Sequence, residues 1–167
     1  ILVAPDPPVD QLQALTSPES GTRPLRADKK GHTMSLALTT TLPHPFPEAV
    51  ERTRAALADQ GFGILTEIDV QATLKTKLDE DMEPYLILGA CNPPLAHRAL
   101  GVQRQIGLLL PCNVVVRSDP DDPNQTLVEA MDPDVMVQVS GEPGLEPVAR
   151  DAAQKLRAAI DALSNQP

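Results

Sequence analysis

The sequence predicts an α+β fold in which an antiparallel or mixed sheet packs helices on one of its faces. Short segments with a two-residue alternation of apolar side chains are interspersed with longer segments of helical period. The valine-rich strands need cover, and each predicted helix has a single apolar stripe. A sheet backed by helices satisfies both requirements. The hairpin-like spacing after Cys112 favours antiparallel pairing.

The first predicted elements are strand, helix, strand and short helix. Residues 36–42 alternate as a half-buried strand does, and three prolines between residues 43 and 47 end it and open a helix. Gly61 is the expected end of that helix. Residues 62–68 then predict a strand, and residues 70–78 a short helix with one apolar side.

The next elements surround the two cysteines. Residues 85–90 form a dense apolar strand that ends at Cys91. Two prolines, at residues 93 and 94, then start a helix that we expect to continue to about Leu110. Residues 113–117 hold three successive valines and predict the following strand.

The last third of the chain predicts a hairpin and a long helix. A turn at residues 119–124 leads to a strand at residues 126–130. We interpret residues 135–139 as a further strand or as its continuation. Gly144 opens the final helix, whose apolar residues keep helical spacing to Leu163.

Composition argues against two classes of partner. The formal net charge of −9 opposes nucleic-acid binding, which needs a basic face, and attraction to anionic membranes. No apolar run approaches the roughly 20 residues that span a bilayer. Two cysteines are too few for a disulfide framework, so we expect a cytoplasmic location.

Residues 1–33 differ from residues 34–167. The first part has five prolines, scattered charges and almost no periodicity. We expect a flexible N-terminal segment, either a linker from an upstream domain or an over-extended gene start with Met34 as the initiator. We expect residues 34–167 to form a single α+β domain.

The two cysteines stand in similar settings, each followed by an asparagine: Cys91-Asn92 and Cys112-Asn113. A disulfide, a metal site and nucleophilic catalysis all stay open for such a pair. Cys91 precedes a helix start, which favours an anion and so a thiolate, and His97 one turn into that helix is its candidate partner. Packing as a small hydrophobe is the alternative.

Metal ligation by the cysteines needs further ligands, for which His97, Met131 and Met136 are the sources. We assign no metal site and no cofactor from the sequence. Glu67 and Asp69 form a candidate carboxylate pair on one side of a strand, and Lys75 is a candidate anion ligand. A solvated surface, a helix cap and core filling are the structural alternatives for these secondary candidates.

These segments resemble the bacterial and archaeal domain-of-unknown-function family 302. The matching motifs are GFGILTEIDV at residues 61–70 followed by LK at 74–75, GACNP at 89–93, LPCNVVV at 110–116 and MDP at 131–133. The resemblance covers residues 34–163. It implies a TATA-binding-protein-like α+β fold with a curved, mainly antiparallel sheet, and a homodimer. It implies no common reaction. Cys91 and Cys112 match motif positions of the family, but the resemblance assigns them no role.

Our first hypothesis is a small-ligand binding or sensing module whose site lies near the two Cys-Asn motifs, because both motifs stand at strand–helix junctions where clefts form. One alternative is a thiol-dependent redox or metal-binding protein that uses Cys91. Another is a structural dimerisation module of a larger chain.

Overall fold

The structure, a computed structural model, describes residues 36–165. The chain divides into two units, Ile1–Met34 and Ser35–Pro167, and every described residue belongs to the second. The expectation of a flexible segment at residues 1–33 therefore lies outside the described residues.

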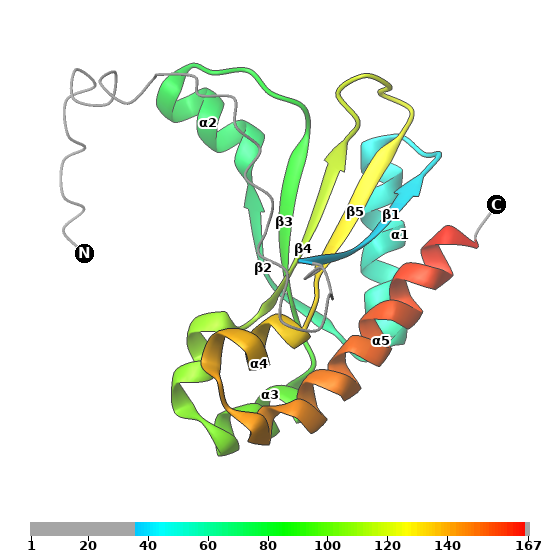
Figure 1. The fold of residues 1–167 in the computed structure, drawn as a ribbon. Helices are drawn as coiled ribbons and strands as arrows, with labels where there is room; N and C mark the ends of the chain where they lie inside the picture. Colours follow the sequence, from blue (N-terminus) through cyan, green and yellow to red (C-terminus); the bar gives the residue numbers. More distant parts are fainter. Residues whose placement is uncertain (1–35, 166–167) are drawn as a thin grey trace, which may run out of the picture. The chain divides into compact units, whose positions relative to one another are not determined.

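A five-stranded sheet organises the described part of the chain (Figure 1). Its strands lie in the order β1-β5-β4-β3-β2, and all neighbouring pairs are antiparallel. The chain thus crosses the sheet between β1 and β2 and then returns strand by strand. The predicted α+β class is confirmed. The strands are β1 (Ala37–Leu42), β2 (Gly63–Asp69), β3 (Tyr85–Cys91), β4 (Cys112–Ser118) and β5 (Thr126–Met131).

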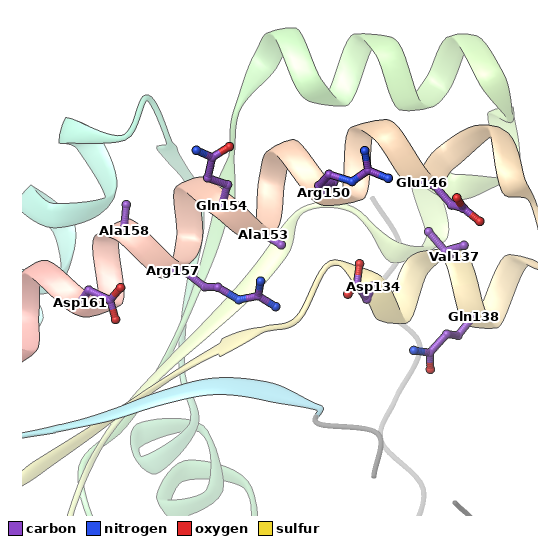
Figure 2. Close-up of a pocket in the computed structure, with 10 residues that line it drawn as sticks. All are labelled: Asp134, Val137, Gln138, Glu146, Arg150, Ala153, Gln154, Arg157, Ala158 and Asp161. Carbon is purple, nitrogen blue, oxygen red and sulfur yellow. The ribbon is translucent and has the colours of Figure 1, made fainter. Parts of the chain in front are cut away.

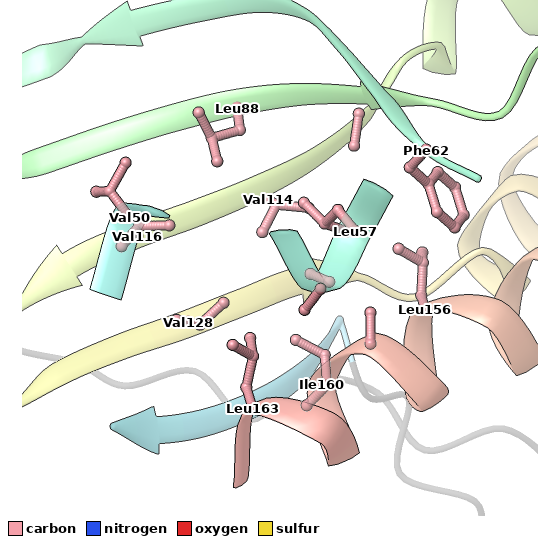
Figure 3. Close-up of a cluster of buried hydrophobic side chains, with 14 of the residues drawn as sticks. Val50, Leu57, Phe62, Leu88, Val114, Val116, Val128, Leu156, Ile160 and Leu163 are labelled. Atoms are coloured by element: carbon pink, nitrogen blue, oxygen red, sulfur yellow. The ribbon is translucent and has the colours of Figure 1, made fainter. Parts of the chain in front are cut away.

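Helices α1 and α5 pack together on one face of the sheet (Figure 1). Strand residues that face them are buried: Val114 and Val116 of β4 are fully buried, whereas Val115 between them is partly exposed. Figure 3 shows side chains of both helices meeting those of the strands. The helices are α1 (Phe46–Asp59), α2 (Val70–Leu78), α3 (Pro93–Val102), α4 (Asp134–Ser140) and α5 (Glu146–Ser164), with 3-10 turns η3 (Arg104–Leu109) and η4 (Pro143–Leu145).

A second hydrophobic cluster lies at one end of the sheet, where α3, η3 and α4 meet the first half of α5 (Figure 1). Met136 of α4 and Ile106 of η3 are each only 2% exposed within it. Helix α5 joins the two clusters, because Ala152 belongs to the second and Leu156, one turn later, to the first. We call the α3, η3 and α4 region the helical cap.

The interpretation of residues 135–139 as a strand is wrong, because they form most of α4. Their alternating valines fit a strand, but local hydrogen bonds favour the helix. The Asp132 carboxylate accepts a hydrogen bond from the Asp134 backbone N–H at 3.0 Å. Gly141 then ends the helix in the left-handed conformation, with φ 65°.

Three helix predictions differ from the structure in detail. The helix expected to reach Leu110 ends at Val102, near the weak helix former Gly101, and a 3-10 turn follows. The final helix begins at Glu146, after the turn η4 that contains Gly144. The predicted apolar side of α2 is not buried, and Leu78 is 51% exposed.

Among the described residues, no helix combines the length and the apolar character that crossing a membrane requires.

Candidate functional site

The two cysteine motifs lie at the same end of neighbouring strands. Strand β3 ends at Cys91, and β4 begins at Cys112. The strand register pairs Ala90 with Cys112, so the residue before Cys91 is the direct neighbour of the second cysteine. Helix α3 and the turn η3 connect the two positions and turn the chain back to the sheet.

A small cavity lies beside the two motifs, with a volume of about 20 Å³. This is close to the space that one water molecule needs. Its wall is almost entirely apolar, since Asn92 and the two thiols are its only side chains with polar character. The lining residues are Phe62, Ala90, Cys91, Asn92, Leu95, Ala96, Ala99, Leu110, Pro111, Cys112, Met136, Val148 and Ala152.

Asn92 connects two helices. Its side-chain Nδ2 donates a hydrogen bond to the Gly61 carbonyl oxygen at 3.1 Å, and its Oδ1 accepts one from the Leu95 backbone N–H at 3.3 Å. The end of α1 is thereby tied to the start of α3. Gly61 has φ 81°, and a Cβ there would lie 3.1 Å from Asn92 Nδ2, so both the conformation and the close approach require glycine.

The start of α3 offers little to an anion. Its first two residues, Pro93 and Pro94, have no backbone N–H, and the next N–H is already bound by Asn92. The start of this helix therefore has no free backbone N–H that could stabilise a Cys91 thiolate, contrary to the expectation from the sequence. The two prolines were visible in the sequence, and the consequence for anion binding could have been drawn from them.

Both cysteines are free thiols whose pKa is raised. Burial raises the pKa of Cys91, which is partly exposed. Burial, together with the nearby charge of Cys91, raises the pKa of Cys112 to about 11 from an ordinary 9.0. At neutral pH both thiols are protonated, which opposes a role as nucleophiles.

Two primary candidates, His97 and Asn113, lie outside this cavity, as does the secondary candidate Met131. His97 is exposed on α3, and Asn113 is exposed on β4, where the alternation turns it away from the side of Cys112. Met131 is half-buried and packs against both hydrophobic clusters. Met136 does line the cavity. Within residues 36–165, no group of three or more His, Cys, Asp or Glu side chains is placed to hold a metal ion.

The secondary candidates belong to local contacts around β2 and α2. Glu67 pairs with Arg54 of α1, whose hydrogen bonds lower the pKa of the carboxyl. Asp69 caps α2, as predicted, by accepting the Ala72 N–H at 2.8 Å. Lys75 forms ion pairs with two aspartates at 2.9 Å and 3.0 Å. None of these residues lines the cavity beside the cysteines.

A larger concave surface lies between α4 and α5 and was not identified from the sequence (Figure 2). This α4–α5 groove has a volume of about 780 Å³. Its signal in the sequence was the polar row on the last helix, which resembles any solvated helix face. The lining residues are Asp134, Val137, Gln138, Glu146, Arg150, Ala153, Gln154, Arg157, Ala158 and Asp161.

Comparison with known proteins identifies the family. The profile described as domain of unknown function DUF302 matches residues 38–163. The chain belongs to the DUF302 family. Among solved structures it is similar to an uncharacterized conserved DUF302 protein from Bacillus stearothermophilus, with 29% identity and a TM-score of 0.70 over 77% of this chain and 98% of that one. No curated protein matches the sequence. The DUF302 match supports the predicted family and leaves its chemistry open.

Proposed function

We propose that residues 36–165 form a small-ligand-binding domain that takes an apolar molecule into the cavity beside Cys91 and Cys112. The observation that carries this proposal is the position of the cavity between the two hydrophobic clusters. Phe62, Ala90 and Cys112 belong to the cluster under the sheet, while Leu95 and Met136 belong to the helical cap.

A boundary between two clusters is where a domain opens with least loss of packing. The present volume of about 20 Å³ does not hold an organic ligand. Binding therefore requires the helical cap to move away from the end of the sheet. Such a movement would report the presence of the ligand at the surface of the domain, which is the property of a sensing module.

The apolar wall determines the class of ligand. A charged group in this cavity would lose its hydration, and Asn92 has its side-chain amide and carbonyl already bound. The thiols are soft, uncharged and weak hydrogen-bonding groups. An uncharged apolar ligand of a few carbon atoms matches these walls.

Benzene serves as the probe, with the methionine methyl groups labelled by ¹³C. We expect saturable shifts of the Met136 methyl in the wild-type protein. Ala96→Leu, which fills the cavity from a partly exposed helical position, should abolish them. Ala158→Leu is the matched control, since Ala158 is also a partly exposed helical alanine but lies outside the cavity. A wild-type protein that shows no response up to the solubility of benzene contradicts the proposal.

We propose self-association as a second function, on the sheet face that α1 and α5 leave uncovered. The strand register aligns Ile68, Ile87 and Val115 as an apolar band across β2, β3 and β4 on this face. Opposite Val115, β5 presents Glu129, and Leu127 lies two residues from it on the same face. Ile68 is 50% exposed. Arg117 and Glu129 form an ion pair at 2.9 Å beside the band. A second copy offers the same band and both charges, which suits a two-fold contact.

Sedimentation across a concentration series tests this second function. We expect a dimer for the wild-type chain and a monomer for Ile87→Lys, which places a charge within the apolar band. Thr39→Lys, on the exposed margin of the same face, should stay dimeric. A wild-type chain that is monomeric at its highest soluble concentration contradicts self-association through this face.

A further inference from the structure

The α4–α5 groove contains one basic side chain, Arg150, that makes no ion pair with another described residue. Most lysines and arginines of the described residues are engaged by nearby carboxylates, as Arg54 is by Glu67 and Arg117 by Glu129. Only Arg104, Arg150 and Lys155 make no ion pair or side-chain hydrogen bond with another described residue. Of these three, Arg150 lines the groove.

Arg157 is the second arginine of the groove, and its position is partly fixed. Its Nη2 lies 3.6 Å from the carboxylate of Asp132, whose side chain is only 10% exposed. That carboxylate is itself held by the Asp134 backbone N–H. An arginine oriented by a buried carboxylate loses less side-chain entropy when it binds a ligand, because one of its geometries is already favoured.

The charges along α5 follow a symmetrical order. Glu146, Arg150, Gln154, Arg157 and Asp161 follow one another at spacings of three or four residues, and all line the groove. They therefore form a single row on one side of the helix. The row is negative at both ends and positive around Gln154. Figure 2 shows this row on α5, with Asp134 and Gln138 on α4.

The dimensions suit a small ligand. The two arginines are seven residues apart, which separates their Cα atoms by about 10 Å along the helix. Guanidinium groups on side chains of this length can both reach an oxyanion near Gln154 and bind it with paired N–H donors. The groove volume of about 780 Å³ is within the range of small-molecule sites.

We propose that the α4–α5 groove binds a small organic oxyanion, a carboxylate or a phosphate monoester, that also carries hydroxyl groups. The oxyanion lies between Arg150 and Arg157. The hydroxyl groups donate to an acidic side chain at one end of the row, Glu146 or Asp161. This site lies apart from the cysteine cavity, because Val148 and Ala152 line that cavity from other positions of α5.

Glycerate, glycerol phosphate and glycerol form a matched set of probes, since they share hydroxyl groups and differ in the anionic group. The readout is the side-chain Nε–Hε signal of each arginine in ¹⁵N spectra. We expect saturable shifts of Arg150 and Arg157 with at least one of the two anions and none with glycerol. A response to glycerate alone identifies a carboxylate site, and a response to glycerol phosphate alone identifies a phosphate site.

Substitutions distinguish specific binding in the groove from general attraction of an anion to any exposed arginine. We expect Arg150→Gln to weaken binding by about tenfold or more, equivalent to about 1.4 kcal/mol. Arg104→Gln is the matched control, because Arg104 is equally unpaired but does not line the groove. Arg157→Gln also removes the Asp132 contact, so the test depends on Arg150. Shifts that increase without saturation, or that are as large at Arg104 as at Arg150, overturn the proposal, as does a lack of response to both anions.

Discussion

The raised pKa of the Cys112 thiol predicts a loss of stability at alkaline pH. The side chain is 6% exposed and its pKa is about 11, against an ordinary 9.0 in the unfolded chain. As the pH rises through 9, the unfolded state loses its thiol proton first and is stabilised relative to the folded state. The stability that the buried thiol contributes is therefore fully present below about pH 9 and is lost as the pH rises through about 11.

Two pKa units correspond to about 3 kcal/mol of unfolding free energy. The assay is urea denaturation of the wild-type chain and of Cys112→Ala at intervals from pH 8 to pH 11. The substitution costs about 1–3 kcal/mol at every pH through lost packing. The pH-dependent part is measured by the change in the difference between the two proteins, which cancels the titration of lysines and of the tyrosine.

We expect the stability difference between wild-type and Cys112→Ala to decrease by about 2 kcal/mol between pH 8 and pH 11, because at pH 11 the folded thiol is only half ionised and the full effect lies at higher pH. Cys91→Ala is the matched control and should show a smaller change, because Cys91 is partly exposed. A wild-type to Cys112→Ala difference that stays constant over this range refutes the reasoning. It would mean that the Cys112 thiol ionises in the folded protein as readily as in the unfolded chain.

Three further outcomes are expected. Asn92→Ala should lower the unfolding free energy, measured by urea denaturation, by about 2–3 kcal/mol, because it removes a helix cap and leaves the Gly61 carbonyl without its donor. Asn92→Asp should recover the part of this loss that is due to the cap. Gly89→Ala should destabilise the fold by about 1–3 kcal/mol, because the new Cβ would lie 2.2 Å from a threonine oxygen. Gly101→Ala should be neutral or stabilising, because nothing lies within 4 Å of its Cβ. Thermal unfolding of both variants tests the difference. Iodoacetamide should alkylate Cys91 with a pH midpoint above the ordinary thiol pKa, and it should leave Cys112 unmodified until the chain unfolds. A Cys91 midpoint below the ordinary thiol pKa would instead support thiol chemistry.

Much of the sheet could be predicted because its signal is local. Strand β4 was predicted from three successive valines, whose strand propensity is a local property, and its residues alternate between buried and more exposed in the structure. Helix α4 could not be predicted in this way. Its valines have strand propensity, and the hydrogen bond from the Asp134 N–H to Asp132 decides the conformation against that propensity.

The candidate site was harder to predict because it depends on tertiary fit. Cys91 and Cys112 lie on adjacent strands, but burial rather than a helix start determines the direction of their pKa shifts. The polar row around Arg150 is visible in the sequence as an exposed helix face. Only the placement of α4 beside that face makes it a groove, and no local pattern encodes that placement.

The two concave surfaces border α5 from different sides, and this makes their ligands separable. Val148 and Ala152 line the small apolar cavity, whereas Arg150 and Ala153 line the charged groove. Because the helix backbone stands between them, a single small molecule with an apolar body and an anionic head cannot occupy both. Benzene should therefore shift the Met136 methyl without moving the Arg150 signal to its glycerate-bound position. Competition between benzene and glycerate for one site would show that the described cavity and groove open into each other, which contradicts the separation of the two proposals.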